Sequence, residues 1–225
     1  MSDKDPSSVH EPPDPVAALI LAAGESARMG SDASRPIKAL LPWRGSTLLR
    51  HCAEVALASR CAEVHVVVGA NREALERELE GLDVQVIHHE KWQQGMGSTI
   101  ALAIDRLAGH LRGATVLLCD QPFVTPELLD ELIVRAPADG REIAACRYRG
   151  TLGPPAFFAR STFERLAALE GDRGAKSLLT LNPERVSIVD FPLGAFDIDT
   201  REDYDRALGE LARMNAGSNR LEGSS

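Results

Sequence analysis

A stretch of small residues followed by two cations could bind a polyphosphate. The apolar segment 16–21 leads directly into LAAGESARMG at residues 21–30. Small side chains after a strand let backbone N–H groups approach a phosphate chain closely, and Arg28 and Lys38 would add full positive charges beside them. The stretch contains neither a Walker loop nor the glycine pattern of dinucleotide-binding folds. The residues alone leave two interpretations open, an anion-binding loop and a surface turn with two solvated cations.

Two aspartates could hold a metal ion next to such a loop. Asp120 follows directly after the apolar segment 114–119, at a place where a side chain can point into a site. Asp199 stands in the sequence DIDTRED, which also has the pattern of a helix start. Magnesium is bound by a few carboxylates together with phosphate oxygens and water. On the residues alone, Asp120 could equally shape the turn before Gln-Pro, and Asp199 could be only a helix cap.

The remaining polar candidates carry weaker signals. Asn71 follows the β-branched segment 64–68 and could cap the next helix. His88 and His89 follow another strand, but no third ligand stands at metal spacing, so we expect both to lie at the surface. The cysteines stand far apart and form no CxxC pair, so we expect core thiols rather than disulfides or metal ligands. They are Cys52, Cys61, Cys119 and Cys146.

Alternating elements must bring these residues together. The residues predict strands over 16–21, 64–68, 84–88, 114–119, 143–146 and 186–189. They predict helices over 48–58, 72–80, 98–111 and 200–214, and a further helix that starts at Thr125-Pro126. This order indicates a three-layer α/β/α, Rossmann-like fold with a mostly parallel sheet. Ligands of such sheets bind beyond the carboxyl ends of the strands, so we expect the loop at 21–30, Asn71 and Asp120 to meet there.

Composition excludes two large classes of partner. The 225 residues include 25 Lys and Arg against 33 Asp and Glu, a net charge of −8, which argues against a nucleic-acid partner. No apolar run approaches the roughly 20 residues that span a bilayer, so we expect no membrane partner. The length predicts one domain over 16–214, with a disordered leader over 1–15 and a disordered tail over 215–225. The leader lacks an apolar signal segment, so we expect a cytoplasmic protein.

Five short segments, in this order, resemble the nucleotidyltransferases that activate sugars, polyols and molybdopterin. The second and third are similar to the W-x-x-G-M-x-x-S and D-Q-P segments of the molybdenum cofactor cytidylyltransferase branch of this molybdopterin nucleotidyltransferase family. The resemblance covers roughly residues 15 to 212. The segments are LAAGESARMG (21–30, followed by Lys38), WQQGMGS (92–98), LCDQP (118–122), GDRGAK (171–176) and DIDTREDY (197–204).

The resemblance implies a nucleotidyltransferase fold and the transfer of a nucleoside monophosphate, foremost CMP from CTP, to the phosphate of molybdopterin with release of pyrophosphate. An ionised phosphate is already a nucleophile, so positioning and charge neutralisation would suffice for catalysis. Catalytic roles fall to Arg28, Lys38 and Asp120, and Asp120 and Asp199 would bind Mg²⁺, with Asp197 in reserve. The nucleotide would contact Leu21, Ala22, Ala23, Gly24, Arg28, Lys38, Asn71, Gly95 and Ser98.

Several alternatives stay open. The guanylyl relatives carry LAGG where this chain has LAAG, and the methyl group of Ala23 favours a pyrimidine over guanine by a modest margin. GTP as donor, a sugar or polyol phosphate as acceptor, and a non-catalytic cofactor carrier are the rival functions. A transient contact with a molybdoenzyme or its maturation factor would follow from the product. The chain departs from the family pattern at two places. Residues 31–37 lengthen the spacer before Lys38, which bears on phosphate binding, and Pro154 replaces the family's histidine, which bears on the acceptor.

Overall fold

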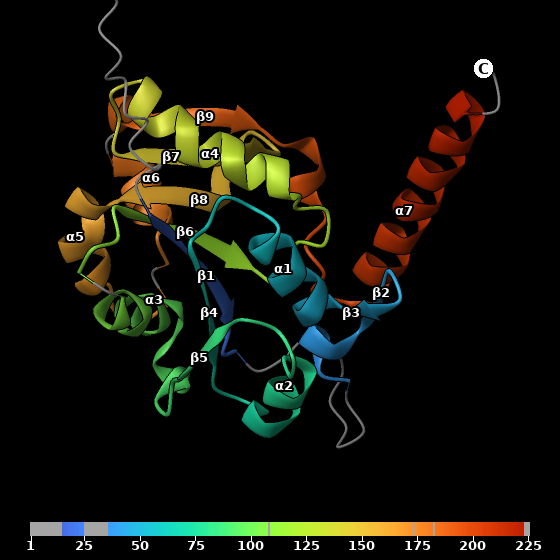
Figure 1. Cartoon of the computed structure of the whole chain (residues 1–225), viewed down its shortest axis with the longest axis horizontal. Coiled ribbons are helices and arrows are strands. Elements are labelled where there is room, and N and C mark those ends of the chain that lie inside the picture. Colours follow the sequence, from blue (N-terminus) through green and yellow to red (C-terminus); the bar gives the residue numbers. More distant parts are fainter. Residues whose placement is uncertain (1–14, 25–35, 108, 173, 182, 223–225) are drawn as a thin grey trace, which may run out of the picture.

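The computed structural model describes residues 15–24, 36–107, 109–172, 174–181 and 183–222, with side chains through residue 216. Within these ranges, seven strands form one sheet in the order β5–β4–β1–β6–β8–β7–β9 (Figure 1). The strands are β1 (Val16–Ala22), β4 (Glu63–Val68), β5 (Gln85–His88), β6 (Gly113–Leu118), β7 (Ile143–Tyr148), β8 (Thr151–Ala159) and β9 (Val186–Asp190), and β2 (Pro42–Trp43) pairs with β3 (Ser46–Thr47). The α-helices are α1 (Leu48–Leu57), α2 (Arg72–Glu78), α3 (Met96–Arg106), α4 (Pro126–Ala138), α5 (Phe163–Ala167), α6 (Lys176–Leu181) and α7 (Arg201–Glu222). The short 3-10 helices are η1 (Lys38–Leu40), η2 (Trp92–Gln94), η3 (Arg160–Thr162), η4 (Pro183–Arg185) and η5 (Pro192–Ala195).

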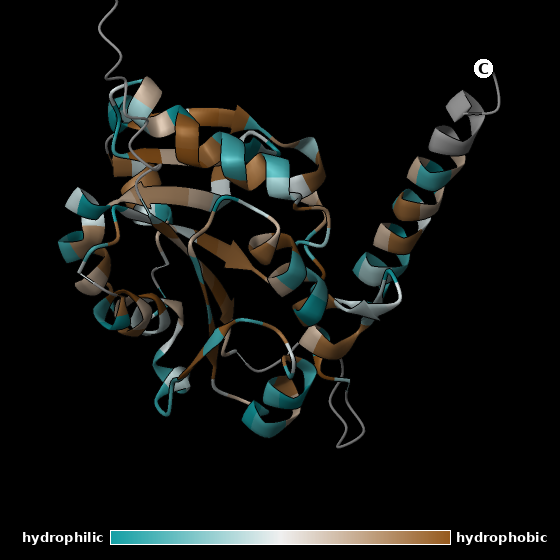
Figure 2. Ribbon diagram, in the orientation of Figure 1, coloured by the Kyte–Doolittle hydropathy of each residue, from teal (hydrophilic) through white to brown (hydrophobic). Residues whose placement is uncertain are grey.

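The central strand β1 separates two hydrophobic clusters, because successive side chains of a strand point to opposite faces of the sheet. Ala18, Ile20 and Ala22 pack in a cluster with α1, α2 and α4. Leu19 and Leu21 pack on the other face with α3, α5 and α6. The central strands β1 and β6 are correspondingly apolar (Figure 2). These two covered faces confirm the predicted three-layer α/β/α fold.

Strand β8 is the one strand of the seven-stranded sheet that the prediction missed, and the short elements β2, β3, α5 and α6 were not predicted either. It runs antiparallel to both β6 and β7, whereas the other pairs in the sheet are parallel. Its sequence TLGPPAFFA holds two prolines, which cannot donate to a ladder and argue against a central strand. The ladder with β7 shifts between Gly153 and Ala156, so that Pro154 and Pro155 lie in an irregularity and leave the flanking hydrogen bonds intact. The sheet is mostly parallel, as predicted.

Helix boundaries agree with the sequence where caps define them. Thr125 accepts a hydrogen bond from the Leu128 amide, and Pro126 takes the first turn of α4, as predicted. The closing helix α7 differs from its predicted end at 214: it continues to Glu222, and no proline interrupts the segment. The remaining predicted tail, residues 223–225, and residues 1–14 of the leader lie outside the described residues.

Four further observations complete the fold. The cysteines are free thiols, and three of them are buried, as expected. Helix α7 projects from the body of the molecule (Figure 1), and its first turn is anchored by Tyr204, whose hydroxyl donates to the Pro42 carbonyl at 2.6 Å.

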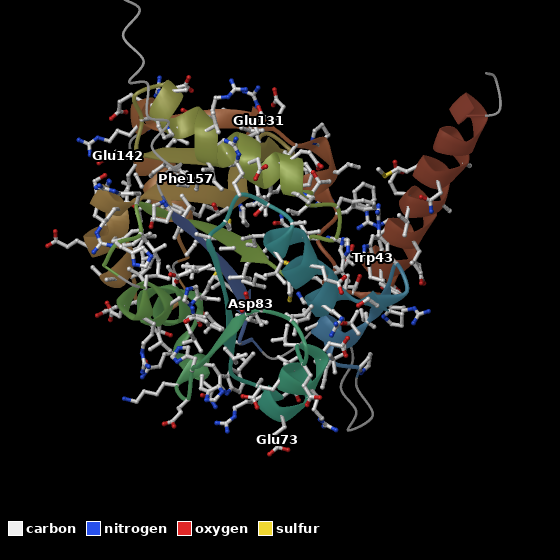
Figure 3. All side chains as sticks on the ribbon, viewed as in Figure 1. Trp43, Glu73, Asp83, Glu131, Glu142 and Phe157 are labelled. Atoms are coloured by element: carbon white, nitrogen blue, oxygen red, sulfur yellow. The ribbon has the colours of Figure 1, made fainter. Side chains whose placement is uncertain are left out.

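Trp43 is fully buried and packs edge-on against Phe123, while charged side chains such as Asp83 and Glu73 cover the outside (Figure 3). No helix in the described part of the chain is long and apolar enough to span a membrane.

Candidate active site

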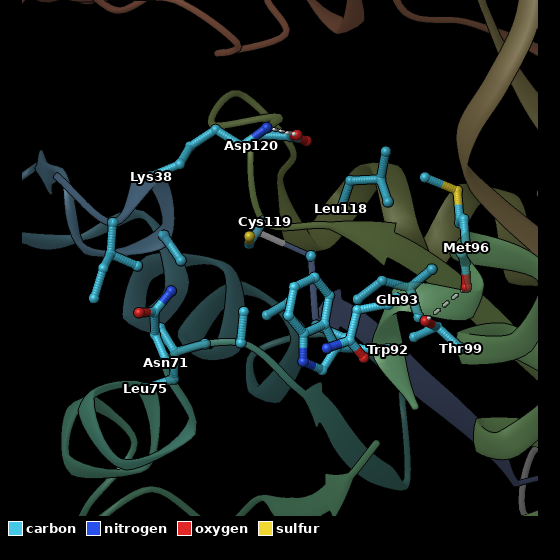
Figure 4. Close-up of a pocket in the computed structure, with 18 of the residues that line it drawn as sticks. Lys38, Asn71, Leu75, Trp92, Gln93, Met96, Thr99, Leu118, Cys119 and Asp120 are labelled. Carbon is cyan, nitrogen blue, oxygen red and sulfur yellow. Dashed lines mark hydrogen bonds and ion pairs between the residues drawn. The ribbon is translucent and has the colours of Figure 1, made fainter. Parts of the chain in front are cut away.

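A cleft of about 530 Å³ opens beyond the carboxyl ends of β1, β4 and β6 (Figure 4). Strand β1 pairs with β4 on one side and with β6 on the other. The chain runs from β1 to β4 and β5 on one side and then crosses to β6 on the other side, so the strand order reverses at β1. Such a switch point is where open α/β sheets bind their ligands. The lining residues come from several loops at this edge of the sheet and include Leu21, Ala22, Ala23, Gly24, Lys38, Asn71, Trp92, Gln93, Gly95, Met96, Thr99, Asp120 and Asp172.

Lys38 holds two carboxylates together at one end of this cleft. Its Nζ lies 2.5 Å from Asp120 Oδ2 and 3.1 Å from Asp199 Oδ1. Burial alone would lower the pKa of Lys38, but the charge and hydrogen bond of Asp120, with the hydrogen bond of Asp199, outweigh burial and hold that pKa above its usual value. The structure therefore keeps a permanent positive charge between two acidic side chains that are 82 and 161 residues away in the sequence.

The main chain and a helix cap place Asp199 beside Asp120. The amide of Ile198 donates to the Asp120 carbonyl at 3.1 Å, which fixes the 197–199 segment against the end of β6. Thr200 and Asp203 form the reciprocal capping pair of α7, with the Thr200 amide donating to Asp203 Oδ2 at 2.9 Å and the Asp203 amide to Thr200 Oγ1 at 3.2 Å. The alternative interpretation of Asp199 as the helix cap is wrong, and its carboxylate contacts Lys38 instead.

Asp197 lies on the same segment but in a different environment. Burial, together with the charges of Asp120 and Asp199, raises the pKa of Asp197 from 3.8 to about 6. Its Oδ1 is buried and has no hydrogen-bond partner among the described residues, and the same is true of Asp120 Oδ1. Lys38 donates a hydrogen bond to Asp199, whereas among the described residues it donates none to Asp197.

The two carboxylates fit a divalent cation whose remaining ligands come from a substrate and from water. Asp120 offers a buried oxygen with no partner among the described residues, and Asp199 presents its carboxylate to the same lysine nitrogen. Within the described ranges, no group of three or more His, Cys, Asp or Glu side chains converges as a complete metal cage. Magnesium does not need one, since it is held by one or two carboxylates with phosphate oxygens and water.

The other end of the cleft combines close backbone packing with two side-chain amides. A Cβ on Gly69 would lie 2.6 Å from Trp92 Cβ and 2.7 Å from the Ala23 carbonyl, so this glycine lets the three loops approach. Asn71 precedes α2 in a left-handed conformation, and its side chain makes no capping hydrogen bond. The capping role left open for Asn71 is therefore not what its side chain does. Asn71 and Gln93 both line the cleft (Figure 4).

A glycine contact joins two of the segments that carry the resemblance. The Gly97 amide donates to the Gly171 carbonyl at 2.8 Å, which links the start of α3 to the loop that holds Asp172. Gly95 lies between them with φ of +96°, a conformation that favours glycine. A Cβ at Gly95 would lie 2.5 Å from Asp172 Oδ1 and 2.6 Å from the Gly171 carbonyl. Gly95 therefore allows Gly171 and Asp172 to pack against the start of α3, where Asp172 forms part of the cleft wall.

Gly95→Ala is expected to disturb this wall. The methyl group must displace the Gly171 main chain or strain Gly95, so we expect the free energy of unfolding to fall by about 2 kcal/mol and the KM for nucleotide to rise by about tenfold. Thermal unfolding and steady-state kinetics measure the two effects. Gly209→Ala on α7 is the matched control, because a Cβ there meets nothing within 4 Å. Unchanged KM and stability in Gly95→Ala would contradict the role assigned to this contact.

The predicted site residues fall into three groups. Most of them meet in one cleft: Leu21, Ala22, Ala23, Gly24, Lys38, Asn71, Gly95 and Asp120 line it, and Asp199 contacts Lys38. Ser98 does not belong to the lining residues, and its hydroxyl is engaged by His89 and by the Gly95 carbonyl. Arg28, together with Arg35 in the longer spacer, lies outside the described residues.

Some lining residues were not expected from the sequence. Gln93, Met96, Thr99 and Asp172 line the cleft, and no role was predicted for any of them. The available signal was the place of Gln93 and Met96 in WQQGMGS and of Asp172 in GDRGAK, two of the segments that carry the resemblance, whereas Thr99 directly follows WQQGMGS. A second correction concerns the two histidines: His88 is exposed, as expected, but the prediction is wrong for His89, which is only 6% exposed.

Known proteins share both the sequence pattern and the fold. The profile of the MobA-like NTP transferase domain matches residues 18–186. Nicotine blue oxidoreductase from Paenarthrobacter nicotinovorans is 32% identical over 198 residues, which is 84% of this chain and 92% of that protein. Both matches span most of the α/β domain described above.

Solved structures support the same assignment. Rv0371c of Mycobacterium tuberculosis H37Rv in complex with manganese is 28% identical, with a TM-score of 0.71 over 85% of this chain and 97% of that one. A nucleotidyl transferase from Methanothermobacter thermautotroptrophicus shares the fold, with a TM-score of 0.78 at 22% identity over 89% of this chain and 99% of that one. The cleft at the switch point, its paired carboxylates and the profile match lead to one conclusion: the chain belongs to the MobA-like NTP transferase family.

Proposed function

We propose that this nucleotidyltransferase-family chain transfers CMP from CTP to the terminal phosphate of a molybdopterin-type acceptor, with Mg²⁺ as its cofactor. The observation that carries the proposal is the contact of Lys38 with both Asp120 and Asp199 at the end of the cleft. One cation and two carboxylates are what a reaction between two phosphates requires, since the reactants bring their own nucleophile and the charge must be neutralised. A family that acts on nucleoside triphosphates supplies the donor class.

Each charged residue has a role in the proposed reaction. An oxygen of the acceptor phosphate attacks the α-phosphorus of the nucleotide in line; a new P–O bond forms while the bond to pyrophosphate breaks. Lys38 neutralises charge that develops on the phosphates, and Arg28 from the LAAGESARMG loop is proposed to assist it. Asp120 and Asp199 would hold Mg²⁺, which supplies a further positive charge to the phosphates when bound. Manganese in the complex of the Mycobacterium relative supports a divalent cation here.

The base is proposed from the residues at the far end of the cleft. Ala23 is almost fully buried and its methyl group takes up room that a glycine would leave to a purine. Asn71 and Gln93 present amides that can pair with the edge of a base. This favours CTP over GTP by a modest factor, since one methyl group separates the two. The acceptor is proposed from the resemblance of WQQGMGS and DQP to the cytidylyltransferase branch, with a sugar or polyol phosphate as the rival.

The proposed product is a dinucleotide cofactor that another protein must receive. A transient contact with a molybdoenzyme or its maturation factor therefore belongs to the proposal. A carrier that only binds the cofactor is the alternative of another class. The joint presence of Lys38, Asp120 and Asp199 argues against it, because a carrier has no use for a cation and a metal site at the reacting phosphates.

One incubation series tests the function. The protein is mixed with each of the four nucleoside triphosphates, Mg²⁺ and molybdopterin, and pyrophosphate release is measured. We expect release to be fastest with CTP, to need the acceptor, and to stop when a chelator removes the metal. Faster release with GTP would overturn the base assignment, and no release with any triphosphate would favour the carrier. A parallel assay with nicotine blue covers the activity in the name of the Paenarthrobacter relative.

A further inference from the structure

His89 follows strand β5 and is held on the outer side of the cleft wall. Its backbone amide donates to the Val68 carbonyl at 2.8 Å, which pins it against the end of β4. The side chain is buried and its Nε2 lies 2.9 Å from Ser98 Oγ. His89 does not belong to the residues that line the cleft, so it has no contact of its own with the space for the nucleotide.

The direction of the hydrogen bonds follows from the proton count. The Ser98 hydroxyl has one proton and donates it to the Gly95 carbonyl at 2.7 Å. The bond between His89 and Ser98 must therefore be donated by the imidazole, through Nε2–H. Burial lowers the pKa of His89, so the ring is neutral and a single tautomer, protonated at Nε2, fits these contacts.

The Gly95 carbonyl is the point at which these contacts meet. Besides Ser98, it accepts from the Thr99 amide at 3.3 Å and from Thr99 Oγ1 at 3.2 Å. Gly95 and Thr99 both line the cleft, and Gly95 also packs against Gly171 and Asp172. A change at His89 would thus act through Ser98 on the first turn of α3 and on the wall that faces the nucleotide.

We infer that His89 is a positioning residue of the nucleotide site. By donating a hydrogen bond to Ser98, it fixes the segment from Gly95 to Thr99, which forms a wall of the cleft together with Asp172. The inference rests on the proposed function, since it assigns the wall to nucleotide binding. It also gives Ser98 a role different from the direct nucleotide contact predicted from the sequence. The Ser98 hydroxyl acts as a link between the buried ring and the Gly95 carbonyl.

Three variants separate the hydrogen bond from simple packing. His89→Leu removes the donor, His89→Gln keeps an N–H that can reach Ser98, and Ser98→Ala removes the link. His88→Leu is the matched control, because His88 is exposed and contacts Glu76 instead. Binding of CTP with Mg²⁺ is followed by the fluorescence of Trp92, which lines the cleft, and kcat and KM are measured in the pyrophosphate assay.

We expect His89→Leu and Ser98→Ala to weaken CTP binding and raise its KM by about tenfold, the scale of one lost hydrogen bond, with kcat changed less than KM. The double variant should be no worse than either single one. His89→Gln should recover most of the affinity, and His88→Leu should match the wild type. Unchanged binding in His89→Leu would overturn the inference, as would a loss in His89→Gln equal to that in His89→Leu.

A readout without nucleotide keeps this inference distinct from the proposed function. Hydrogen–deuterium exchange of the Gly97 and Thr99 amides, both hydrogen-bonded in the wall, should accelerate in His89→Leu but not in His89→Gln. If the wild type binds no nucleoside triphosphate, the proposed function and this nucleotide-site role fail together. If nucleotide binds and the exchange of these amides is the same in all variants, the proposed function stands and the inference is overturned.

Discussion

Asp120→Asn should lower kcat for pyrophosphate release by about a thousandfold, which is the scale of losing one preorganised electrostatic contact together with metal binding. The amide has the shape of the carboxylate but no charge, so it can neither hold Mg²⁺ firmly nor balance Lys38 at 2.5 Å. We expect the Mg²⁺ concentration that gives half-maximal activity to rise more than about tenfold for the same reason. A magnesium titration of the pyrophosphate assay measures both effects.

The fold should survive this change. Asp120 lies near two other carboxylates, and the loss of its charge relieves part of the repulsion that raises the pKa of Asp197. Thermal unfolding of Asp120→Asn checks that point, and Asp83→Asn, an exposed aspartate outside the cleft, is the matched control. Wild-type turnover with an unchanged Mg²⁺ requirement in Asp120→Asn would show that Asp120 is not a metal ligand.

Lys38→Met is expected to lower kcat by a similar factor, about a thousandfold. In contrast to Asp120→Asn, it should leave the Mg²⁺ concentration for half-maximal activity unchanged or lower it. Methionine keeps the length of the side chain and removes the positive charge that the phosphates need. It also removes the cation that contacts Asp120 and Asp199, so the two carboxylates should bind Mg²⁺ equally well or more tightly. Because the pKa of Lys38 is held above its usual value, the wild-type ammonium stays charged across the neutral range, and the loss should not depend on pH there.

The comparison of the two variants distinguishes their roles. A raised Mg²⁺ requirement in Asp120→Asn beside an unchanged or lower one in Lys38→Met assigns the carboxylate to the metal and the amine to the phosphates. Lys91→Met, at an exposed position outside the cleft, should retain wild-type kinetics. Should Lys38→Met turn over CTP at the wild-type rate, the proposed chemistry of the site would be wrong.

Much of the fold followed from patterns that act locally. The β-branched run at 64–68 and the capped start at Thr125-Pro126 each specify an element from its own residues, whereas the apolar segment at 16–21 is a strand only by its place in the alternating order. Since parallel strands end at one edge, their order along the chain was enough to place Asn71 and Asp120 near the same cleft. The meeting of Lys38 with Asp120 and Asp199 was expected from the family resemblance rather than from spacing.

The parts that could not be predicted depend on long-range contacts. Strand β8 is a strand despite Pro154 and Pro155, because the ladder with β7 shifts around them, and no local pattern signals that irregularity. His89 is buried where it contacts Val68 at the end of β4 and Ser98 in α3, and these contacts could not be told from the pair of histidines in the sequence. The sequence did not tell which residue caps α7. In the structure Thr200 and Asp203 form the cap through reciprocal hydrogen bonds, and the carboxylate of Asp199 contacts Lys38 instead.

The separation of the site residues along the chain also has a consequence for biosynthesis. Lys38 meets partners 82 and 161 positions further on, and contacts between such distant residues form only after long loops have closed. A ribosome that has produced the first strands has made residues 21–30 but not Asp199. A chain that ends before Asp199 lacks the second carboxylate at Lys38. Under the proposed function, such a chain should release pyrophosphate only after the segment 197–199 has been made and has packed against the end of β6.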